Sequence, residues 1–448
     1  MAWYNPTTWG KTKTRRFPAQ RNYAGAGAGR LLAGFLGNSS SADQEIRPAL
    51  RKLRDRCRQL ARNEPIAAKA LQIFRTQVVG DKGLHLQVRA RNIPRAGQLK
   101  GDLDMTGNDI VERAFKEWSQ KGICEVSGKF SWIDCQQMVQ ESLVRDGEVL
   151  IKHIRNADNR FGYAIQFLEP DYLDEEYNVD RTNGNRVVMG VELNQYNKPI
   201  AYHLHSGTTH PYDSAGQIGH KVRVPAEDIL HIYKPERCQQ TRGVPLFASV
   251  MNQIHQLNGY TEAELVAARL SASKSMFLET QDGTGYAGDD FDQDAPIMDA
   301  GEPGSISQLP PGVRIVTPNM DHPNSGYEGF HKAMLRTIAS GLGLDYVTLS
   351  SNLESVSYSS IRSGTIEERD QWLVKQNWMI QHFMLPIYEN WLSMQLLTNT
   401  VGQDMTMFDS LMDVRWQAKS WNWVDPLKVS KASVEAINAG LKTHSEVI

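Results

Sequence analysis

The sequence of 448 residues has few cysteines, no long apolar run and almost no net charge. Its four cysteines, Cys57, Cys124, Cys135 and Cys238, form no CxxC pair, so we expect reduced, partly buried thiols and neither a zinc site nor a disulfide framework. No apolar stretch approaches the roughly 20 residues that a membrane span requires, and the N-terminus lacks the apolar segment of a secretory signal. These absences favour a protein that is made in the cytoplasm and has no membrane partner.

The formal net charge of −2 argues against a protein that binds nucleic acid over its whole surface, because such proteins are strongly basic. The charge is nevertheless distributed unevenly. Residues 1–41 contain Lys and Arg but no acid, in a low-complexity sequence rich in Gly, Ala and Ser. Such a segment cannot bury much apolar surface. We therefore predict a flexible basic N-terminal arm that binds a partner or nucleic acid.

The motifs of common enzyme classes are also missing. The segment from Asn5 to Thr12 ends like a phosphate-binding loop, but Asn5 stands where that loop requires Gly, and no strand precedes it. The run with Asp290, Asp292 and Asp294 begins like a calcium loop but lacks the Gly and the Glu that complete one. No HExxH or GxSxG sequence occurs. The sequence therefore predicts no catalytic residue, no cofactor and no metal site.

The order of the predicted elements indicates a mixed α+β protein. Residues 43–79 show a helical periodicity that Pro65 divides into two helices. Residues 83–233 combine further helices with strands separated by turn sequences such as Asp146-Gly147, which predicts an antiparallel sheet. Two long helices, at residues 245–273 and 327–340, then flank a small insert with short strands and many acids.

The most distinctive segment follows the second of these long helices. Gly341 and Gly343 are expected to end that helix, since Gly tolerates positive φ. The residues from Leu344 to Ser360 are rich in Ser and Asn and include only two acids, Asp345 and Glu354. An unusually long helical pattern then runs from about Ser360 to Leu397, and Pro386 is predicted to kink it. A polar loop with little charge, placed between two helices, suits contact with a long charged polymer that must not be held tightly.

At this point several segments in a fixed order resemble the portal proteins of tailed bacteriophages, of the lambda-like type. They are RDRCRQLARNEPIAAKALQIFRTQVVG, WIDCQQMVQESLVRDGEVLIKHI, GYAIQFLEPDYLD, RVVMGVELNQYNKPIAYHL, VPAEDILHIYKPERCQQTRGVPLFASVM, the loop that ends in YSSIRSG, and WVDPLKVSKASVEAINAGLKT. Each segment alone is a weak signal, whereas their order and spacing together are specific.

The resemblance implies an α+β portal fold, in which a wing, stem helices, a clip, a tunnel loop and a long kinked helix lead to a crown. After the arm, the matching segments are a wing at 42–243, a first stem helix at 244–274, a clip at 275–325, a second stem helix at 326–342, a tunnel loop at 343–360, the long kinked helix with its return to the wing at 361–412, and a crown at 413–448. Thr443 and Glu446 are spaced as a capping box, so we expect a further helix and a longer crown beyond the printed sequence.

The resemblance also implies an assembly and its partners. It implies a ring of about twelve copies at one vertex of the capsid, through which double-stranded DNA is packaged and ejected. The implied partners are the ring neighbours, double-stranded DNA, the terminase large subunit, a head–tail connector or head completion protein, and the major capsid and scaffolding proteins. The implied location is the virion, with assembly in the host cytoplasm.

Three groups of side chains carry the predicted contacts. The side chains predicted to face the DNA channel are Asn352, Ser355, Ser357, Tyr358 and Ser359. Those predicted to contact phosphates or a neighbouring subunit are Lys274, Arg362 and Arg369, the two arginines with Glu367 or Glu368 as alternative partners. The clip acids predicted to dock a partner are Asp289, Asp290, Asp292 and Asp294.

Two other functions stay open on the sequence alone. A DNA-acting enzyme would need Asp290, Asp292 and Asp294 to hold a metal ion, and metal-dependent cleavage by the purified protein would reveal it. A monomeric nucleic-acid binder would act through the basic arm, and its mass in solution would distinguish it from a ring.

Overall fold

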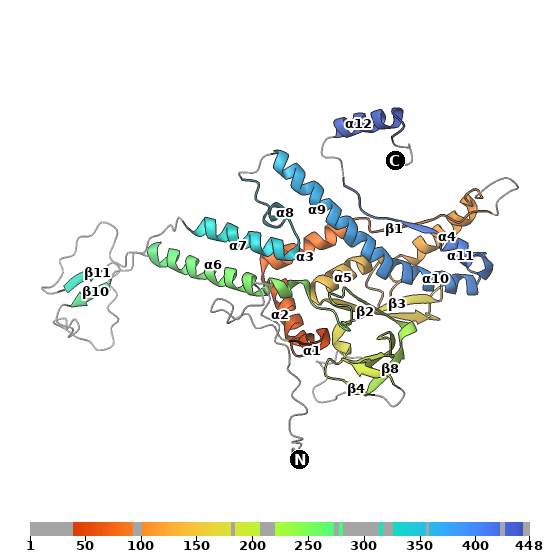
Figure 1. Ribbon diagram of the computed structural model, residues 1–448, viewed down its shortest axis with the longest axis horizontal. Helices are drawn as coiled ribbons and strands as arrows, with labels where there is room; N and C mark the ends of the chain where they lie inside the picture. Colours follow the sequence, from red (N-terminus) through yellow and green to blue (C-terminus); the bar gives the residue numbers. More distant parts are fainter. Residues whose placement is uncertain are drawn as a thin grey trace, which may run out of the picture.

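The computed structural model describes residues 39–92, 101–180, 184–206, 220–272, 277–280, 313–316, 326–354, 358–421 and 426–441. Within these ranges, small antiparallel sheets combine with long helices, which confirms the predicted mixed α+β class. A broad body carries a pair of helices that projects away from it, as Figure 1 shows.

Three helices open the described chain: α1 (Ala42–Ile46), α2 (Leu50–Asn63) and α3 (Pro65–Val78). Ser41 begins α1 in a capping box, because its side chain accepts from the Gln44 amide while the Gln44 side chain accepts from the Ser41 amide. Pro65 is the first residue of α3, where the missing amide hydrogen costs nothing. The predicted division of this region at Pro65 is therefore confirmed.

A three-stranded sheet lies at the centre of the body, with β2 (Glu148–Arg155) between β3 (Tyr163–Leu168) and β9 (Ile229–Tyr233). Two helices that pack in this part of the body are capped by side chains, α4 (Met105–Trp118) by Asp104 and α5 (Trp132–Arg145) by Ser131. The second sheet has the order β4-β5-β6-β7-β8 and consists of β4 (Val179–Asp180), β5 (Arg186–Val188), β6 (Val191–Leu193), β7 (Pro199–His205) and β8 (Lys221–Pro225). Short 3-10 turns connect the two sheets, η4 (Pro170–Tyr172) between β3 and β4 and η5 (Ala226–Asp228) between β8 and β9.

A further sheet joins two strands that are far apart in the sequence. β1 (His85–Val88) pairs antiparallel with β12 (Val414–Gln417), so that His85 lies opposite Gln417 and Val88 opposite Val414. The segment predicted as crown starts at residue 413, but its first residues belong to this sheet on the body. The sequence did not reveal the pairing, because four-residue strands carry no signal of their distant partner.

The projecting pair consists of α6 (Met251–Ala272), which a 3-10 turn precedes at η6 (Leu246–Ser249), and α7 (Tyr327–Leu342). The Tyr260 ring on α6 stacks on that of Tyr327 at 5.8 Å and meets the edge of Phe330 at 4.8 Å. Beyond this pair, β10 (Phe277–Thr280) and β11 (Val313–Val316) form an antiparallel two-stranded sheet. The two predicted long helices and strands of the insert between them are thus present.

The long helix near the C-terminus contains a wide turn. α9 (Tyr358–Met379) leads into a π-helical segment (Ile380–Met384) and then α10 (Leu385–Leu397). The Leu385 amide donates to the carbonyl of Ile380, five residues earlier, and Pro386 follows in the first turn of α10. Sequence analysis predicted a kink at Pro386; the structure has a π-helical turn just before this residue, which lets the helix continue up to a proline that has no amide to donate. The remaining short elements are η8 (Met405–Met407), α11 (Phe408–Leu411) and α12 (Pro426–Asn438).

Aromatic side chains hold α10 and β12 against the body. The Phe115 ring on α4 has five aromatic neighbours, with centroids between 5.1 and 6.0 Å away, which are Trp118, Trp132, Tyr388, Trp391 and Trp416. Edge-to-face packing of this kind adds stabilisation beyond that of area burial. The cluster explains why the chain returns to the body after α9.

Candidate functional site

The turn after α7 is fixed by its backbone. Gly343 has φ 65° and ψ 38°, in the left-handed region. The Leu344 amide donates to the Ala339 carbonyl at 2.9 Å and the Gly343 amide to that of Ser340 at 3.1 Å. This is the hydrogen-bond pattern with which helices commonly end on glycine. Gly343 therefore ends α7 as predicted.

Gly341 has a different role from the predicted one. It lies within α7, and a Cβ atom at this position would stand 2.3 Å from Cγ1 of Val250. Val250 is buried and lies between η6 and α6. Gly341 therefore lets the C-terminal end of α7 lie close to the segment that leads into α6 (residues 242–250), which we call the root of α6.

The segment predicted as a loop at 343–360 is partly helical, which corrects that prediction. α8 (Tyr346–Ser350) occupies its first half and ends at Ser351, a residue with φ 57°. Leu349 is buried, and the Arg336 guanidinium of α7 lies 5.2 Å from the centre of the Tyr346 ring. α8 is thus packed against the body. The sequence did not predict it, because a helix of one turn in a Ser- and Asn-rich stretch is too short to show a helical period.

Among the residues predicted to face the channel, Asn352 organises the turn after α8. Its Oδ1 accepts from the Glu354 amide at 2.8 Å, and its Nδ2 lies 3.5 Å from Oε2 of Glu354. Ser355 and Ser357 lie outside the described residues. Tyr358 and Ser359 belong to the first turn of α9, so the helix begins two residues before the predicted start at Ser360.

The predicted basic and acidic contacts can be placed only in part. Lys274 and the clip acids Asp289, Asp290, Asp292 and Asp294 lie outside the described residues. Arg362 and Arg369 are on α9.

In the described part of the chain Arg369 forms no ion pair with Glu367 or Glu368, and its buried Nε has no hydrogen-bond partner there. Glu368 instead accepts from the Thr348 hydroxyl at 2.7 Å, which ties α9 to α8. Burial raises the pKa of Glu368, and the nearby Asp345 carboxylate raises it further.

A buried carboxylate that no sequence pattern had indicated lies beside the root of α6. Glu148, the first residue of β2, has no exposed side-chain surface. Its Oε1 accepts from Arg242 Nη2 at 2.6 Å and from Arg54 Nη1 at 3.2 Å. Its Oε2 accepts from His231 Nε2 and from the Gly243 amide, both at 2.9 Å. One carboxylate thus joins α2, β9 and the segment that leads to α6.

The charges of this cluster determine its protonation. Burial by itself would raise the pKa of Glu148, but Arg242 and His231 outweigh it and hold that pKa far below its usual range. Burial lowers the pKa of His231, against the raising effect of Glu148. The carboxylate is therefore ionised, and the imidazole of His231 donates to it.

Close backbone contacts reinforce the same junction. A Cβ atom on Gly147 would lie 2.3 Å from the carbonyl carbon of Val244, and one on Gly243 would lie 2.2 Å from the Gly147 carbonyl oxygen. Arg242 also donates to the Met189 carbonyl at 2.8 Å and so reaches the five-stranded sheet. The root of α6 is thereby fixed to both sheets of the body.

One member of this cluster had a sequence signal. Arg54 is fully buried although it is charged, and it occupies the stripe of α2 that also carries Leu50 and Cys57. An arginine in the apolar stripe of a helix predicts a buried acidic partner. That partner, Glu148, begins a strand after the Asp146-Gly147 turn, and no local pattern links it to Arg54.

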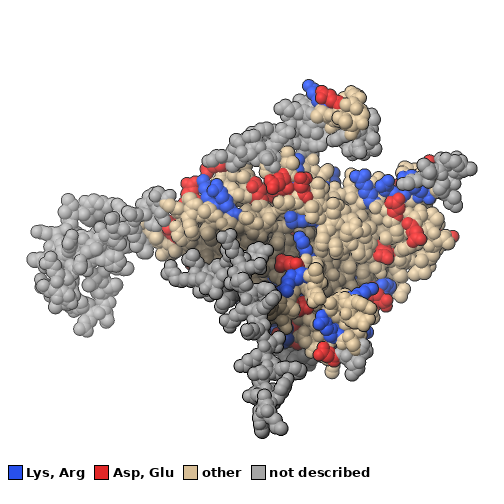
Figure 2. Space-filling model, in the orientation of Figure 1, with Lys and Arg blue, Asp and Glu red and all other residues tan. Residues whose placement is uncertain are grey.

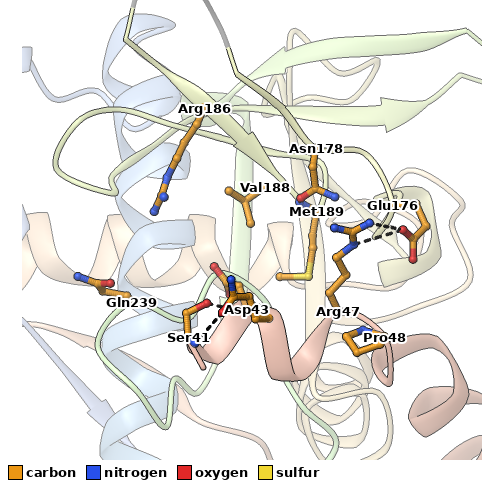
Figure 3. A pocket seen from close by; sticks show the side chains of 11 residues that line it. Ser41, Asp43, Arg47, Pro48, Glu176, Asn178, Arg186, Val188, Met189 and Gln239 are labelled. Atoms are coloured by element: carbon orange, nitrogen blue, oxygen red, sulfur yellow. Dashed lines mark hydrogen bonds and ion pairs between the residues drawn. The ribbon is translucent and has the colours of Figure 1, made fainter. Parts of the chain in front are cut away.

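A pocket of about 540 Å³ lies between α1 and the five-stranded sheet, as Figure 3 shows. Its charged side chains already have partners within the chain. Arg47 pairs with Glu176 at 2.8 Å, and Asp43 accepts from the amide of Thr241 at 2.9 Å. Arg186 donates to the side chain of Asn197 at 2.8 Å. The pocket therefore offers a ligand no charge that lacks a partner.

The described ranges contain no group of three or more His, Cys, Asp or Glu side chains placed to hold a metal ion. In the same part of the chain, no helix has both the length and the apolar character needed to cross a membrane.

Comparison with known proteins gives consistent matches. The family model described as "Phage portal protein, lambda family" matches residues 28–376. A protein named "Probable portal protein" from Halomonas phage phiHAP-1 is 33% identical over 417 residues, which are 92% of this chain and 79% of that protein. Portal protein B of Escherichia phage lambda is 23% identical over 480 residues, 98% of this chain and 87% of its own length.

The chain also matches solved structures, among them a chain from the neck of a native gene transfer agent particle computed with C12 symmetry. It is 13% identical, has a TM-score of 0.45, and the match covers 94% of this chain and 97% of that one. An HK97-family phage portal protein from Corynebacterium diphtheriae is 9% identical with a TM-score of 0.33, over 85% and 98% of the two chains.

Proposed function

Because this chain belongs to the lambda family of phage portal proteins, we propose that it assembles into a ring of about twelve copies at one capsid vertex. Double-stranded DNA enters the capsid through the central channel of this ring during packaging and leaves through it during ejection. The protein is a structural component of the virion and not an enzyme.

The observation that carries the ring proposal is the exposed apolar surface of the long helices. Leu265 and Val266 on α6 are 51% and 47% exposed, and Phe330 on α7 is 46% exposed. A second exposed apolar face, on α9, is formed by Ile366, Leu373 and Val374. Apolar faces on helices of a soluble chain indicate protein contacts, and neighbours in a ring would cover the same faces in every copy.

The predicted parts of the portal then map onto the described elements. The wing comprises the helices and sheets of the body, α6 and α7 form the stem, and β10 and β11 belong to the clip. Residues 343–360, with α8 at their start, form the tunnel segment at the constriction. α9 and α10 form the long helix, and the crown begins after β12 and contains α12.

The composition of the tunnel segment suits a conduit for DNA. Ring symmetry turns each residue at the constriction into a ring of equal groups. A ring of Arg would bind phosphates and oppose sliding, because affinity rises with each neutralised phosphate. Weak, exchangeable contacts are expected from the side chains assigned to the channel, which are Asn352, Ser355, Ser357, Tyr358 and Ser359.

The remaining charged residues are assigned to partners. Lys274, Arg362 and Arg369 contact phosphates or a neighbouring subunit. The clip acids Asp289, Asp290, Asp292 and Asp294 attract basic surfaces of the terminase large subunit and later of the head–tail connector protein. The major capsid and scaffolding proteins are the remaining proposed partners.

The channel assignment is tested by placing charge in the tunnel segment. The triple variant Ser355→Arg, Ser357→Arg and Ser359→Arg should form normal rings but package or retain less DNA, because rings of guanidinium groups hold the phosphates. Packaged DNA is quantified per particle, and ring formation is followed by electron microscopy. The matched control replaces the same serines with Asn, which leaves the segment polar and uncharged. A full complement of DNA in the Arg variant contradicts the assignment.

A further inference from the structure

α8 rests on one stripe of α9, formed by Gly364, Glu368 and Gln371. These positions are four and three residues apart and therefore face the same side of the helix. A Cβ atom on Gly364 would lie 3.9 Å from Oδ2 of Asp345, the residue that precedes α8. The Gln371 Oε1 atom lies 3.8 Å from the place of a Cβ atom on Gly343. The stripe thus supports the chain from the end of α7 into α8.

Glu368 makes a hydrogen bond that joins the two helices. Its Oε2 accepts from the Thr348 hydroxyl at 2.7 Å, while its Oε1 is buried and has no hydrogen-bond partner in the described chain. A buried carboxylate oxygen without a partner lowers stability, so apolar side chains at these two positions would hold the helices together at less cost. A hydrogen bond, however, fixes a distance and a direction, which apolar packing does not. The contact therefore suits a role in position more than a role in stability.

α7 holds the same segment as well. The Arg336 guanidinium lies 5.2 Å from the centre of the Tyr346 ring, and Nζ of Lys332 lies 3.5 Å from Oε2 of Glu354. Figure 2 shows acidic side chains gathered where α8 and α9 lie, with basic side chains beside them over α7. α8 and the turn after it are therefore held by cations of α7 and by the carboxylate of Glu368 on α9.

The next turn of α9 is fixed to the body. The rings of Phe74 on α3 and Trp372 on α9 meet edge to face at 5.3 Å, and Nε2 of Gln376 donates to the Gln77 carbonyl at 3.3 Å. Glu368 lies one turn before Trp372, so its carboxylate has a fixed place relative to α3. A group that ties α8 to this carboxylate also sets the distance of the following turn from the body.

We infer that Glu368 is a positioning residue for the tunnel segment, an inference that rests on the proposed portal function. It holds α8 through Thr348 and so sets how far the turn with Asn352 and Leu353 projects from α9. Ring symmetry repeats this setting in every copy. A small shift of α8 therefore changes the width of the whole channel and, with it, the retention of DNA.

The test compares label positions in purified full-length rings. Leu353 is 62% exposed, so Leu353→Cys can carry a spin label, in a Cys238→Ser background because the other three cysteines are buried. Double electron–electron resonance then measures the distances between labels on different copies. Thr348→Val removes the hydroxyl and keeps the shape, so these distances should shift or broaden. Thr348→Ser keeps the hydroxyl and should keep the original distances.

A second variant separates position from stability. Glu368→Leu with Thr348→Val replaces both polar partners by apolar groups of similar shape, which should leave the thermal midpoint nearly unchanged. The label distances should still shift, and particles with this variant should retain less DNA. Glu368→Gln keeps an acceptor for the hydroxyl and should keep the distances. The control Thr337→Val removes a hydroxyl that donates within α7, to the Ala333 carbonyl at 3.2 Å, and should change neither readout.

Original label distances in both Thr348→Val and the double variant would overturn the inference, because apolar packing alone would then position α8. An equal shift in the Thr337→Val control would also overturn it, since the loss of any hydroxyl near the tunnel segment would then suffice. A wild-type chain that forms no ring would contradict the portal proposal and this inference together, whereas unchanged distances in intact rings contradict the inference alone.

Discussion

At the scale of single residues, the fold depends most on one buried carboxylate. Glu148 neutralises Arg54 and Arg242, both fully buried, and it also fixes His231 and the Gly243 amide. Replacing a buried ion pair by apolar residues often costs little, whereas removing one partner leaves an uncompensated charge. Removing Glu148 would leave Arg242 without its ion pair at the junction between the body and α6, and Arg54 with only Glu175 and Asp171 as partners.

We predict that Glu148→Gln lowers the free energy of unfolding by about 3–5 kcal/mol, because buried Arg242 loses its ion-pair partner and Arg54 loses the nearest of its three. Urea denaturation followed by circular dichroism measures the change. The control Glu176→Gln breaks an exposed pair with Arg47 and should cost no more than about 1 kcal/mol. A similar small effect at both positions would contradict the role of Glu148.

The same cluster predicts a pH dependence. The pKa of Glu148 is lowered in the folded state, so the folded protein binds this proton less readily than the unfolded chain, whose Glu pKa is about 4.3. The stabilisation is therefore complete above about pH 4.3 and is lost as the pH falls toward the folded pKa. The stability difference between wild type and Glu148→Gln should shrink in that acid range and stay constant above it.

At the scale of elements, two glycines of the projecting helices have opposite surroundings. Gly341 in α7 faces the stiff, buried side chain of Val250, whereas Gly259 in α6 has no described atom near its would-be Cβ. Helical glycine costs about 1 kcal/mol relative to alanine, so only a close contact compensates for it.

We predict that Gly341→Ala destabilises the protein by about 1–3 kcal/mol, because the new methyl group overlaps Val250. Gly259→Ala is the matched control and should stabilise the chain by up to about 1 kcal/mol, since a methyl group there meets nothing within the chain. Thermal unfolding of the two variants compares them directly. Equal shifts of the midpoint for both would show that α7 does not approach the root of α6 as described.

Elements with a local signal could be predicted from the sequence. Pro65 at the start of α3 and Gly343 at the end of α7 each act within a few residues, and each element is present. The one-turn helix α8 was missed because five residues are too few to show a period. The π-helical turn before Pro386 was missed because it depends on how the whole helix packs.

The candidate site was less predictable than the elements. The pairing of β1 with β12 and the cluster around Glu148 join residues that are distant in the chain, and a single sequence carries no sign of which partners meet. Arg54 is the exception. Its position in the apolar stripe of α2 is a sequence feature that implies a buried acidic partner, although it does not say which acid this is.

At the scale of the whole molecule, the arrangement suits one copy of a ring. Apolar faces remain exposed on α6, α7 and α9, while the root of α6 is fixed to both sheets of the body by charge and by backbone contact. Such a rigid junction would hold α6 and α7 at a constant angle to the body, as the proposed closed ring requires.

The central claim is tested most directly by the mass of the purified, full-length protein measured by native mass spectrometry over a range of concentrations. We predict one dominant closed assembly of about twelve chains, whose mass does not change with concentration once it has formed. A monomer at every concentration, or open assemblies that grow without limit, would contradict the account.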